Sequence, residues 1–587
     1  MKHKLIAPIT AKSALVQVLL NRGIAEENIG KYITSNWIDV NPPELLGEEN
    51  LVKAYQLLDF HMKNKSKTIL IVDPDVDGNT ASALLLNYLY NIDPSWTESI
   101  YCYFHEGKEH GLDDCVEYIL DNKYEFVLCP DAGSNDRIAC ETLTKYDINV
   151  LILDHHDFDK ENPYALIINN QEGYSNYPNK AFSGVGIVWQ FCRYIDSVLH
   201  TDYVKNYLDL VAVGNCADMM DMRSVETSFL IHQGLKNLRN PYLYYMAQKN
   251  AFKLGSKITP IGAAFYIVPL LNAVQRSGTL DEKKLVFNSM LSFKASDVVP
   301  STKRGHKLGD TELLVEQAVR VSTNVKNRQT RVQDAAIETL EKKIKDENLL
   351  DNKVLLILLE EDNVPAEVRG LIANKFMAKY QRPCCVLTKG KDSDNQIFYA
   401  GSARGCSLAG VDDFKQLCLD TGCVEYAVGH PNAFGLKILK QDLPQFIEKT
   451  NEQLVDMSDE AIYYVDYAFK GHDVDAQIIL DIANMSDYWG TELNEALVAV
   501  EKLKVTPDMV EIYRKTSNTI KITLNNGISL MKFNADEELC DKLTKNNSGY
   551  MELDIVGKCN QNEWNGNVTP QIFIEDFNII DSSKYYF

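Results

Sequence analysis

Apolar runs alternate with amphipathic, helix-like segments between residues 68 and 220. The runs Thr68 to Val72, Phe126 to Pro130 and Ile148 to Leu153 are bounded by turn residues, and each is followed by a helical pattern. Short strands that are apolar throughout are typical of a parallel sheet with helices on both faces. We therefore expect an α/β fold with a parallel sheet in residues 66–300, after a lead-in of short helices in residues 1–65.

A long helix and a second, smaller α/β domain are predicted next. Thr311 to Asp346 contains neither Gly nor Pro and repeats apolar residues at helical spacing. At a rise of 1.5 Å per residue this helix would be roughly 50 Å long, so we assign residues 301–350 to a connection between two domains. Val354 to Leu359 and Cys384 to Thr388 are strand candidates of the second domain, which we place at 351–455.

The tail of the chain shows a different pattern. Ile520 to Leu524, Ser529 to Phe533, Tyr550 to Val556 and Gln571 to Ile574 are short strand-like runs that Asn and Gly residues separate. Closely spaced short strands predict a small β-barrel or sandwich. We place it, with a linker, in residues 456–587.

Composition limits where such a protein works. The 587 residues contain 13 cysteines without any C-x-x-C pair, and no apolar run approaches the roughly 20 residues that cross a bilayer. No export signal is visible at the start of the chain. We expect a cytoplasmic protein without membrane contact, with reduced cysteines and no zinc site.

The net charge of −22 argues against a simple basic nucleic-acid binder. Affinity for phosphate backbones comes chiefly from Lys and Arg side chains. Any contact with DNA must therefore be local, for example at a basic groove or at metal ions bound by carboxylates.

The sharpest chemical signal follows the first predicted strand. Asp73, Asp75 and Asp77 lie directly after it and before a helical pattern, where open α/β sheets bind their ligands. The spacing also resembles a calcium-binding EF-hand loop. That loop requires a Glu at its twelfth position, which is Leu84 here, so we exclude the EF-hand.

Similar residues follow further apolar runs. Asp131 follows the second predicted strand, His155 and His156 follow the third, and Asp218 follows the run that begins at Leu208. Carboxylates and imidazoles suit Mn²⁺ or Mg²⁺ better than zinc, although ligand type alone does not fix the ion. Two ions about 3.5 to 4 Å apart would support phosphoester hydrolysis. The chain has neither a P-loop nor a G-x-S-x-G motif.

These motifs resemble the DHH phosphoesterase superfamily, and further ones resemble its RecJ exonuclease branch. The segment from Pro269 to Arg276 is similar to the P-R-L-N-A-x-G-R motif of that branch. Gly401 to Arg404 and Gly429 to Gly435 look like signatures of the DHH-associated domain, and the tail around Asn562 to Gly566 is similar to the RecJ oligonucleotide-binding (OB) fold.

The resemblance implies roles for particular residues. His156 would face the scissile phosphate, and Asp131 would bridge two Mn²⁺ or Mg²⁺ ions and so take part in catalysis. The implied metal ligands are Asp73, Asp75, Asp77, Asp131, His155 and Asp218. The residues implied to hold the DNA backbone or its 5′ end are Asn272, Arg276, Ser402, Arg404 and His430.

Four positions depart from the family pattern. A histidine often precedes the first aspartate motif, where this chain has Ile71, and Asp73 could compensate for it. Val428 replaces a Gly of the second associated-domain signature. Leu270 and Gln275 replace the Arg and Gly of the P-R-L-N-A-x-G-R motif, so one phosphate contact could be lost.

The function that the resemblance implies is 5′-to-3′ hydrolysis of single-stranded DNA to 5′-mononucleotides, in DNA repair, recombination or replication. We expect a monomer whose partners could include a single-strand-binding protein or a helicase. One alternative is a phosphodiesterase for short oligoribonucleotides or cyclic dinucleotides, but such relatives generally lack the C-terminal barrel. Another is a catalytically decayed replication scaffold, which the retained aspartates and histidines oppose.

Overall fold

The computed structural model describes residues 1–105, 109–361, 364–457, 460–514, 516–545, 549–564 and 566–580, so Asn565 of the predicted tail motif lies outside the described residues. The chain forms two compact units. We call Arg22–Asn327 with Met485–Glu495 the parallel-sheet unit, and Met1–Asn21, Arg328–Asn484 and Ala496–Phe587 together the mixed-sheet unit. The backbone thus passes from one unit to the other four times.

The parallel-sheet unit is built on five parallel strands in the order β3-β2-β4-β5-β6. The strands are β2 (Thr68–Val72), β3 (Tyr101–Phe104), β4 (Phe126–Pro130), β5 (Asn149–Asp154) and β6 (Leu166–Asn169). All residues of β2 and β4 are buried, as expected for strands covered on both faces. This confirms the predicted parallel α/β fold.

Helices cover both faces of this sheet. On one face, the apolar side chains of α6 (Val116–Asp121) and α7 (Arg137–Thr144) pack against alternate residues of β2, β4 and β5. The helices α4 (Val76–Ile92) and α8 (Gly184–Leu199) contact the sheet and each other. The carboxyl ends of the strands therefore open toward the amino ends of α4 and α8.

A helical region follows the sheet. Its helices are α9 (Leu208–Ala217), α10 (Val225–Lys236), α11 (Pro241–Lys249), α12 (Ala251–Leu254), α13 (Pro260–Tyr266), α14 (Val268–Ser277) and α15 (Leu280–Met290). The distant segment Met485–Glu495 joins this unit: the Thr491 carbonyl accepts a hydrogen bond from the Met222 amide at 3.2 Å.

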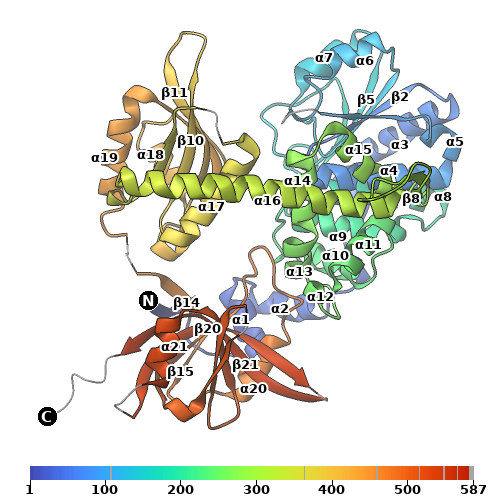
Figure 1. The fold of residues 1–587 in the computed structure, drawn as a ribbon. Helices are drawn as coiled ribbons and strands as arrows, with labels where there is room; N and C mark the ends of the chain where they lie inside the picture. Colours follow the sequence, from blue (N-terminus) through green and yellow to red (C-terminus); the bar gives the residue numbers. More distant parts are fainter. Residues whose placement is uncertain are drawn as a thin grey trace. The chain divides into compact units, whose positions relative to one another are not determined.

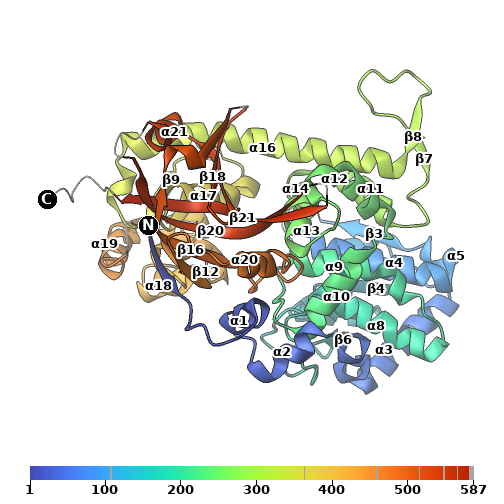
Figure 2. The same cartoon turned by 90° about the horizontal axis from the view of Figure 1, so that it is seen from below.

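One long helix continues from the parallel-sheet unit into the mixed-sheet unit. Helix α16 runs over Leu314–Asp346 and is continuous in Figure 1. The predicted start at Thr311 is three residues early, because β8 (Thr311–Leu313) pairs with β7 (Val298–Pro300) in a hairpin that Figure 2 shows at the end of the helix. Because the backbone of Thr311–Leu313 is hydrogen-bonded in that hairpin, the helix begins at Leu314.

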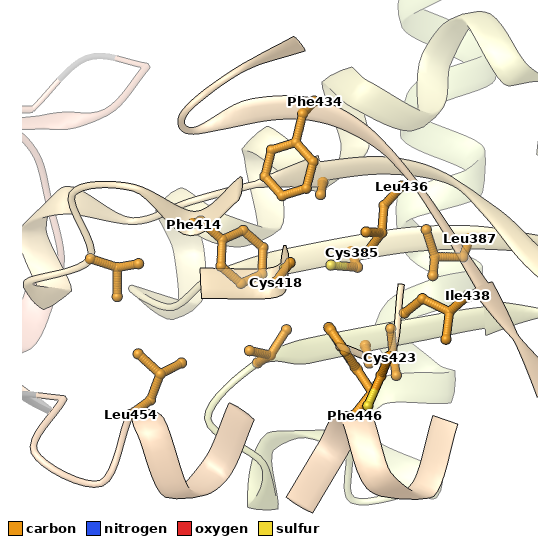
Figure 3. Close-up of a cluster of buried hydrophobic side chains, with 14 of the residues drawn as sticks. Cys385, Leu387, Phe414, Cys418, Cys423, Phe434, Leu436, Ile438, Phe446 and Leu454 are labelled. Carbon is orange, nitrogen blue, oxygen red and sulfur yellow. The ribbon is translucent and has the colours of Figure 1, made fainter. Parts of the chain in front are cut away.

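The mixed-sheet unit contains a five-stranded sheet in the order β12-β13-β11-β10-β9. Its strands are β9 (Leu355–Leu359), β10 (Cys384–Lys391), β11 (Ile397–Arg404), β12 (Tyr426–His430) and β13 (Ala433–Leu439). The helix α17 (Ala366–Tyr380) connects the parallel pair β9 and β10. Figure 3 shows Cys385, Phe414 and Phe446 inside the apolar core on one face of this sheet. All thirteen cysteines are free thiols, as expected.

The second sheet of this unit has seven strands in the order β15-β16-β20-β21-β19-β18-β17. They are β15 (Tyr467–Lys470), β16 (Leu497–Val505), β17 (Val510–Arg514), β18 (Asn518–Thr523), β19 (Ser529–Ala535), β20 (Met551–Trp564) and β21 (Asn567–Ile580). No helix in the described part of the chain is long and apolar enough to cross a membrane.

The first residues of the chain form a strand that the sequence pattern did not predict. Strand β1 (Lys2–Leu5) pairs in parallel with β14 (Ile462–Val465). Helices α1 (Ala14–Asn21), α2 (Glu26–Ile33) and α3 (Glu48–Lys63) follow, as expected. Four residues with only one apolar member carry too little periodicity to reveal a strand.

Candidate metal centre

Two of the three aspartates after β2 are held by the amino ends of helices. Asp75 is the N-cap of α4, and its Oδ1 accepts a hydrogen bond from the Gly78 amide at 2.8 Å. The carboxylate of Asp77 accepts hydrogen bonds from the amides of Gly184 at 2.6 Å and Val185 at 3.2 Å, at the start of α8. Unpaired amides at helix starts favour negative charge, so the fold fixes these carboxylates in place.

Asp131 lies directly after β4 and is almost completely buried. Its φ is 68°, and its amide donates to the Leu153 carbonyl at 2.7 Å. Both carboxylate oxygens are buried and have no hydrogen-bond partner among the described residues. A Cβ at Gly184 would lie 2.1 Å from Oδ1, so only glycine allows α8 this close. Buried carboxylate oxygens without a hydrogen-bond donor fit the coordination of a cation.

The side chain of His155 joins Asp131 to two further aspartates. Its Nε2 lies 3.3 Å from Asp131 Oδ1, 3.5 Å from Asp218 Oδ2 and 3.9 Å from Asp77 Oδ2. Asp218 is the C-cap of α9, whereas the other predicted ligands come after strands of the sheet, with Asp77 already in the first turn of α4. A Cβ at Gly214 of α9 would lie 2.5 Å from Asp77 Oδ1, so this helix also needs glycine to reach the cluster.

Asp154 orients the two histidines and was not among the predicted site residues. Its Oδ1 accepts from the His155 amide at 2.7 Å, from the His156 amide at 3.1 Å and from His156 Nδ1 at 2.8 Å. Its Oδ2 accepts from the Ser134 amide at 3.1 Å. Although burial alone would raise the pKa of Asp154, the hydrogen bond and charge of His156 hold that pKa well below its usual range. Asp154 is therefore an ionised positioning residue.

Several aspartates of the cluster are buried close to one another, and their pKa values are raised as a result. Burial, followed by the charges of neighbouring aspartates, raises the pKa of Asp77 to about 7, that of Asp218 to about 8, and that of Asp131 well above its ordinary value. Burial, together with the charge of His156, lowers the pKa of His155 to about 4, so this imidazole is neutral. Neutral imidazole and crowded carboxylates are the donors that divalent ions need, and the residues present fit a metal centre.

His110 is a site residue that the sequence did not reveal. Its Nδ1 lies 3.0 Å and 3.2 Å from the two carboxylate oxygens of Asp73. Ile71, at the family's usual histidine position, is fully buried among the apolar side chains of α6 and α7 and does not face the centre. A lone histidine in an irregular loop carries no periodic signal, and only the unfilled histidine position could have prompted a search for one.

The predicted residues Asn272 and Arg276 lie on α14, a helix that is hydrogen-bonded to the first turn of α4 beside the three aspartates. Gln275 Nε2 donates to Asn79 Oδ1 at 3.0 Å, and Asn79 Nδ2 donates to the carbonyls of Asp73 at 3.1 Å and Asp75 at 2.7 Å. Gln275, which replaces the family's Gly, is buried in this contact, whereas Arg276 is exposed.

Ser402, Arg404 and His430 lie together in the mixed-sheet unit. Arg404 of β11 and His430 of β12 both pair with Ala433 of β13, and Ser402 lies two residues before Arg404 on the same face of β11. A Cβ at Gly370 of α17 would lie 2.7 Å from Arg404 Nη2 and 3.5 Å from Ser402 Oγ. The structure therefore brings these three residues to one patch of the five-stranded sheet.

Comparison with known proteins agrees with this architecture. The DHH family, N-terminal domain, matches residues 67–215, and the RecJ OB domain matches residues 465–576. The chain is 32% identical over 575 residues to the SPbeta prophage-derived protein YorK of Bacillus subtilis (strain 168), whose name describes a single-strand DNA-specific exonuclease, with 97% of this chain and 96% of the relative covered.

Two RecJ proteins are also similar. The single-stranded-DNA-specific exonuclease RecJ of Bacillus subtilis (strain 168) is 25% identical over 530 residues, which cover 88% of this chain and 62% of that protein. The crystal structure of RecJ in complex with Mn²⁺ from Thermus thermophilus matches with a TM-score of 0.69 at 18% identity, covering 99% of this chain and 80% of that one. By the extent and identity of these matches, the chain belongs to the RecJ-type branch of the DHH family, the single-strand DNA-specific exonucleases.

Proposed function

We propose that this protein is a metal-dependent exonuclease that hydrolyses single-stranded DNA in the 5′-to-3′ direction and releases 5′-mononucleotides. The observation that carries the proposal is the buried carboxylate of Asp131, whose unpartnered oxygens lie beside His155 within a group of further aspartates. The relatives named as exonucleases support the substrate, and the crystal structures of RecJ with Mn²⁺ and with Mg²⁺ support the ion. The direction of cleavage comes from the family pattern.

The proposed ion-binding residues form two groups: Asp73, Asp75 and Asp131 make up one, and Asp77, His155 and Asp218 make up the other. His155 Nε2 lies 3.3 Å from Asp131 Oδ1, and this contact supports Asp131 as the residue proposed to bridge the two ions. When bound, two Mn²⁺ or Mg²⁺ ions would supply an activated water and neutralise charge on the phosphate under attack. The carboxylates, several of which are buried, would hold these ions at the ends of the strands.

His156 is the proposed residue for direct contact with the phosphate. Although burial alone lowers its pKa, the hydrogen bond and charge of Asp154 raise it to about 9. The imidazole is therefore a cation at neutral pH, and because its Nδ1 bonds Asp154, its Nε2–H remains to donate to a phosphate oxygen. More than half of the side chain is exposed, which leaves it open to a substrate.

Recognition of the strand is assigned to other residues. Ser402, Arg404 and His430 would hold the 5′-terminal phosphate by charge-assisted hydrogen bonds, and Asn272 and Arg276 would hold the backbone. In this scheme residues 66–300 hydrolyse the strand, residues 351–455 bind its end, and the OB region in residues 456–587 binds the remainder. We further propose a cytoplasmic monomer that works with a single-strand-binding protein or a helicase.

The test uses single-stranded DNA and RNA of one sequence, labelled at either end, with Mn²⁺. We expect labelled mononucleotide to appear first from 5′-labelled DNA, whereas 3′-labelled DNA shortens gradually. Release of the 3′ label first would reverse the direction, and cleavage of short RNA alone would make the protein an oligoribonucleotide phosphodiesterase.

A matched pair of variants ties hydrolysis to the cluster. Asp131→Asn should lower turnover by at least ~100-fold, that is, by about 2.7 kcal/mol of transition-state stabilisation. Asp221→Asn is the control, because Asp221 lies close to Asp218 in sequence but pairs with Arg223 at 2.6 Å. Equal activity of both variants would contradict the proposed role of Asp131.

A further inference from the structure

A long acid-free stretch lies within the parallel-sheet unit. Residues 227–280 contain six Lys and Arg residues and no Asp or Glu, in a chain whose net charge is −22. The stretch covers most of α10 and all of α11 to α14. Lys257 is paired with Asp487, and the excess of positive charge that remains on an acidic protein favours an anionic partner at this surface.

Large aromatic side chains are exposed on the same helices. Phe252 of α12 is 101% exposed and Phe265 of α13 is 69% exposed, and Tyr244, Tyr245 and Tyr266 are also exposed. The Nζ of Lys253 lies 5.8 Å from the ring centre of Tyr266, which joins α12 to α13. Exposed rings beside lysines are the combination by which proteins bind single strands, with bases on the rings and phosphates at the lysines.

This surface continues toward the candidate metal centre. Helix α13 packs against α14 and against α9, both in contact with the centre: Gln275 of α14 bonds Asn79 of α4, whose side chain donates to the carbonyls of Asp73 and Asp75, and α9 ends at Asp218. In Figure 1 the labels of α12, α13 and α14 follow one another in the green part of the chain. A strand with one phosphate at the centre could therefore extend over α13 and α12.

We propose that the surface over the end of α11, α12 and α13, formed by Lys249, Phe252, Lys253, Phe265 and Tyr266, binds the part of a DNA single strand that follows the nucleotide being hydrolysed. The inference rests on the proposed function for the identity of the strand. Its own support is the charge complementarity of the acid-free stretch and the exposure of the rings. Bases stack on Phe252 and Phe265, and Lys249 and Lys253 neutralise the adjoining phosphates.

The test measures binding of oligo-dT of 4 and 20 nucleotides to the full-length protein by fluorescence anisotropy, in EDTA to prevent hydrolysis. We expect Phe252→Ala with Phe265→Ala to weaken binding of the 20-mer at least ~5-fold, the smallest effect of losing one stacked base, and to affect the 4-mer less. Lys249→Gln with Lys253→Gln should lower the salt dependence, by roughly 0.7 in slope for each lost phosphate contact.

Tyr146→Ala is the matched control, since Tyr146 is 64% exposed in the same unit but outside the acid-free stretch. It should bind both oligonucleotides as wild type does. Unchanged 20-mer binding by the phenylalanine variant overturns the proposal, and a lower molecular mass of that variant in solution would assign the surface to a second copy of the chain instead. If the wild-type protein hydrolyses DNA but the phenylalanine variant binds it as well as wild type, only the proposed surface is refuted. If the variant binds DNA more weakly but the wild-type protein hydrolyses none, only the proposed function is refuted.

Discussion

Asp77, Asp218 and His156 give the metal-free protein a defined dependence on pH. Their pKa values are raised to about 7, 8 and 9, so between pH 6.5 and 8 the native state holds more protons than the unfolded chain. The free energy of unfolding must then fall as pH rises through this window. His155, whose pKa is lowered to about 4, acts in the opposite sense only below about pH 6.5.

We therefore expect the protein in EDTA to unfold at lower urea concentration at pH 8 than at pH 6.5. Mn²⁺ should remove this trend, because an ion bound only by the native state stabilises it and favours ionised carboxylates. Urea titrations at both pH values, with EDTA or Mn²⁺, measure the effect. Asp218→Asn should reduce the dependence of the unfolding free energy on pH in EDTA. If neither Mn²⁺ nor this substitution changed that dependence, the cluster would be excluded as its source.

His110 allows a second prediction at a single residue. Because its imidazole bonds both oxygens of Asp73, it orients a carboxylate of one proposed ion group. Residues of this kind typically change metal affinity by 10- to 100-fold, so His110→Ala should raise the Mn²⁺ concentration for half-maximal hydrolysis by about 10-fold. Turnover at saturating Mn²⁺ should change much less.

The control for this variant is Ile71→Val, a small change in the apolar core at the family's usual histidine position. It should leave the Mn²⁺ requirement unchanged, because the side chain at that position faces α6 and α7. A His110→Ala protein with the wild-type Mn²⁺ requirement would limit His110 to a surface contact.

Residues could be placed in the site from sequence where a regular element delivers them. Asp73 and Asp131 follow strands whose apolar runs are unmistakable, and parallel strands end at one edge of a sheet. Asp154 directly follows the third predicted apolar run, but its role in orienting the histidines depends on hydrogen bonds, and His110 lies in a loop that no periodicity marks. Their roles depend on three-dimensional contacts that a single sequence does not contain.

At the scale of elements, α17 is set close to β11 by a glycine in its middle. Gly370 leaves room for the guanidinium of Arg404 beside Ser402. Alanine favours a helix over glycine by about 1 kcal/mol, so Gly370→Ala should stabilise the unit while its methyl group displaces the flexible end of Arg404.

We expect this variant to unfold at higher urea concentration yet to lose most of its preference for 5′-phosphorylated over 5′-hydroxyl strands. Hydrolysis of both substrates at one salt concentration measures that preference. The control is Ala373→Gly, also in α17, which tests helix stability without touching Arg404. Gly410→Ala would not serve as a control, because Gly410 has a positive φ. Should Gly370→Ala keep the preference, the terminal phosphate must be bound elsewhere.

Elements with strong periodicity were predicted and short ones were not. The 33 residues of α16 lack Gly and Pro and form one helix, but the three residues of β8 at its predicted start carry no period that separates strand from helix. Strand β1 needs β14, some 460 residues later, as its partner, and a local pattern cannot reveal a contact at that separation.

At the scale of the whole molecule, the net charge of −22 and the proposed DNA substrate are compatible because charge is unevenly placed. The acid-free residues 227–280 lie in the unit that also holds the aspartate cluster. A nearly uniform acidic surface would repel DNA, whereas this distribution leaves one basic surface next to carboxylates that cations neutralise.

The four passages of the backbone between the units have a consequence for cleavage of the chain. A recognition sequence for a specific protease after Gly305, at the tip of the hairpin between β7 and β8, would yield fragments 1–305 and 306–587. In the cut protein, β1 of the first fragment still pairs with β14 of the second. The Met222 amide of the first fragment still donates to the Thr491 carbonyl of the second. Each fragment thus holds a piece of the other's unit, so the cut protein should migrate as one species in size-exclusion chromatography, separate only in denaturant, and reassemble when separately made fragments are mixed.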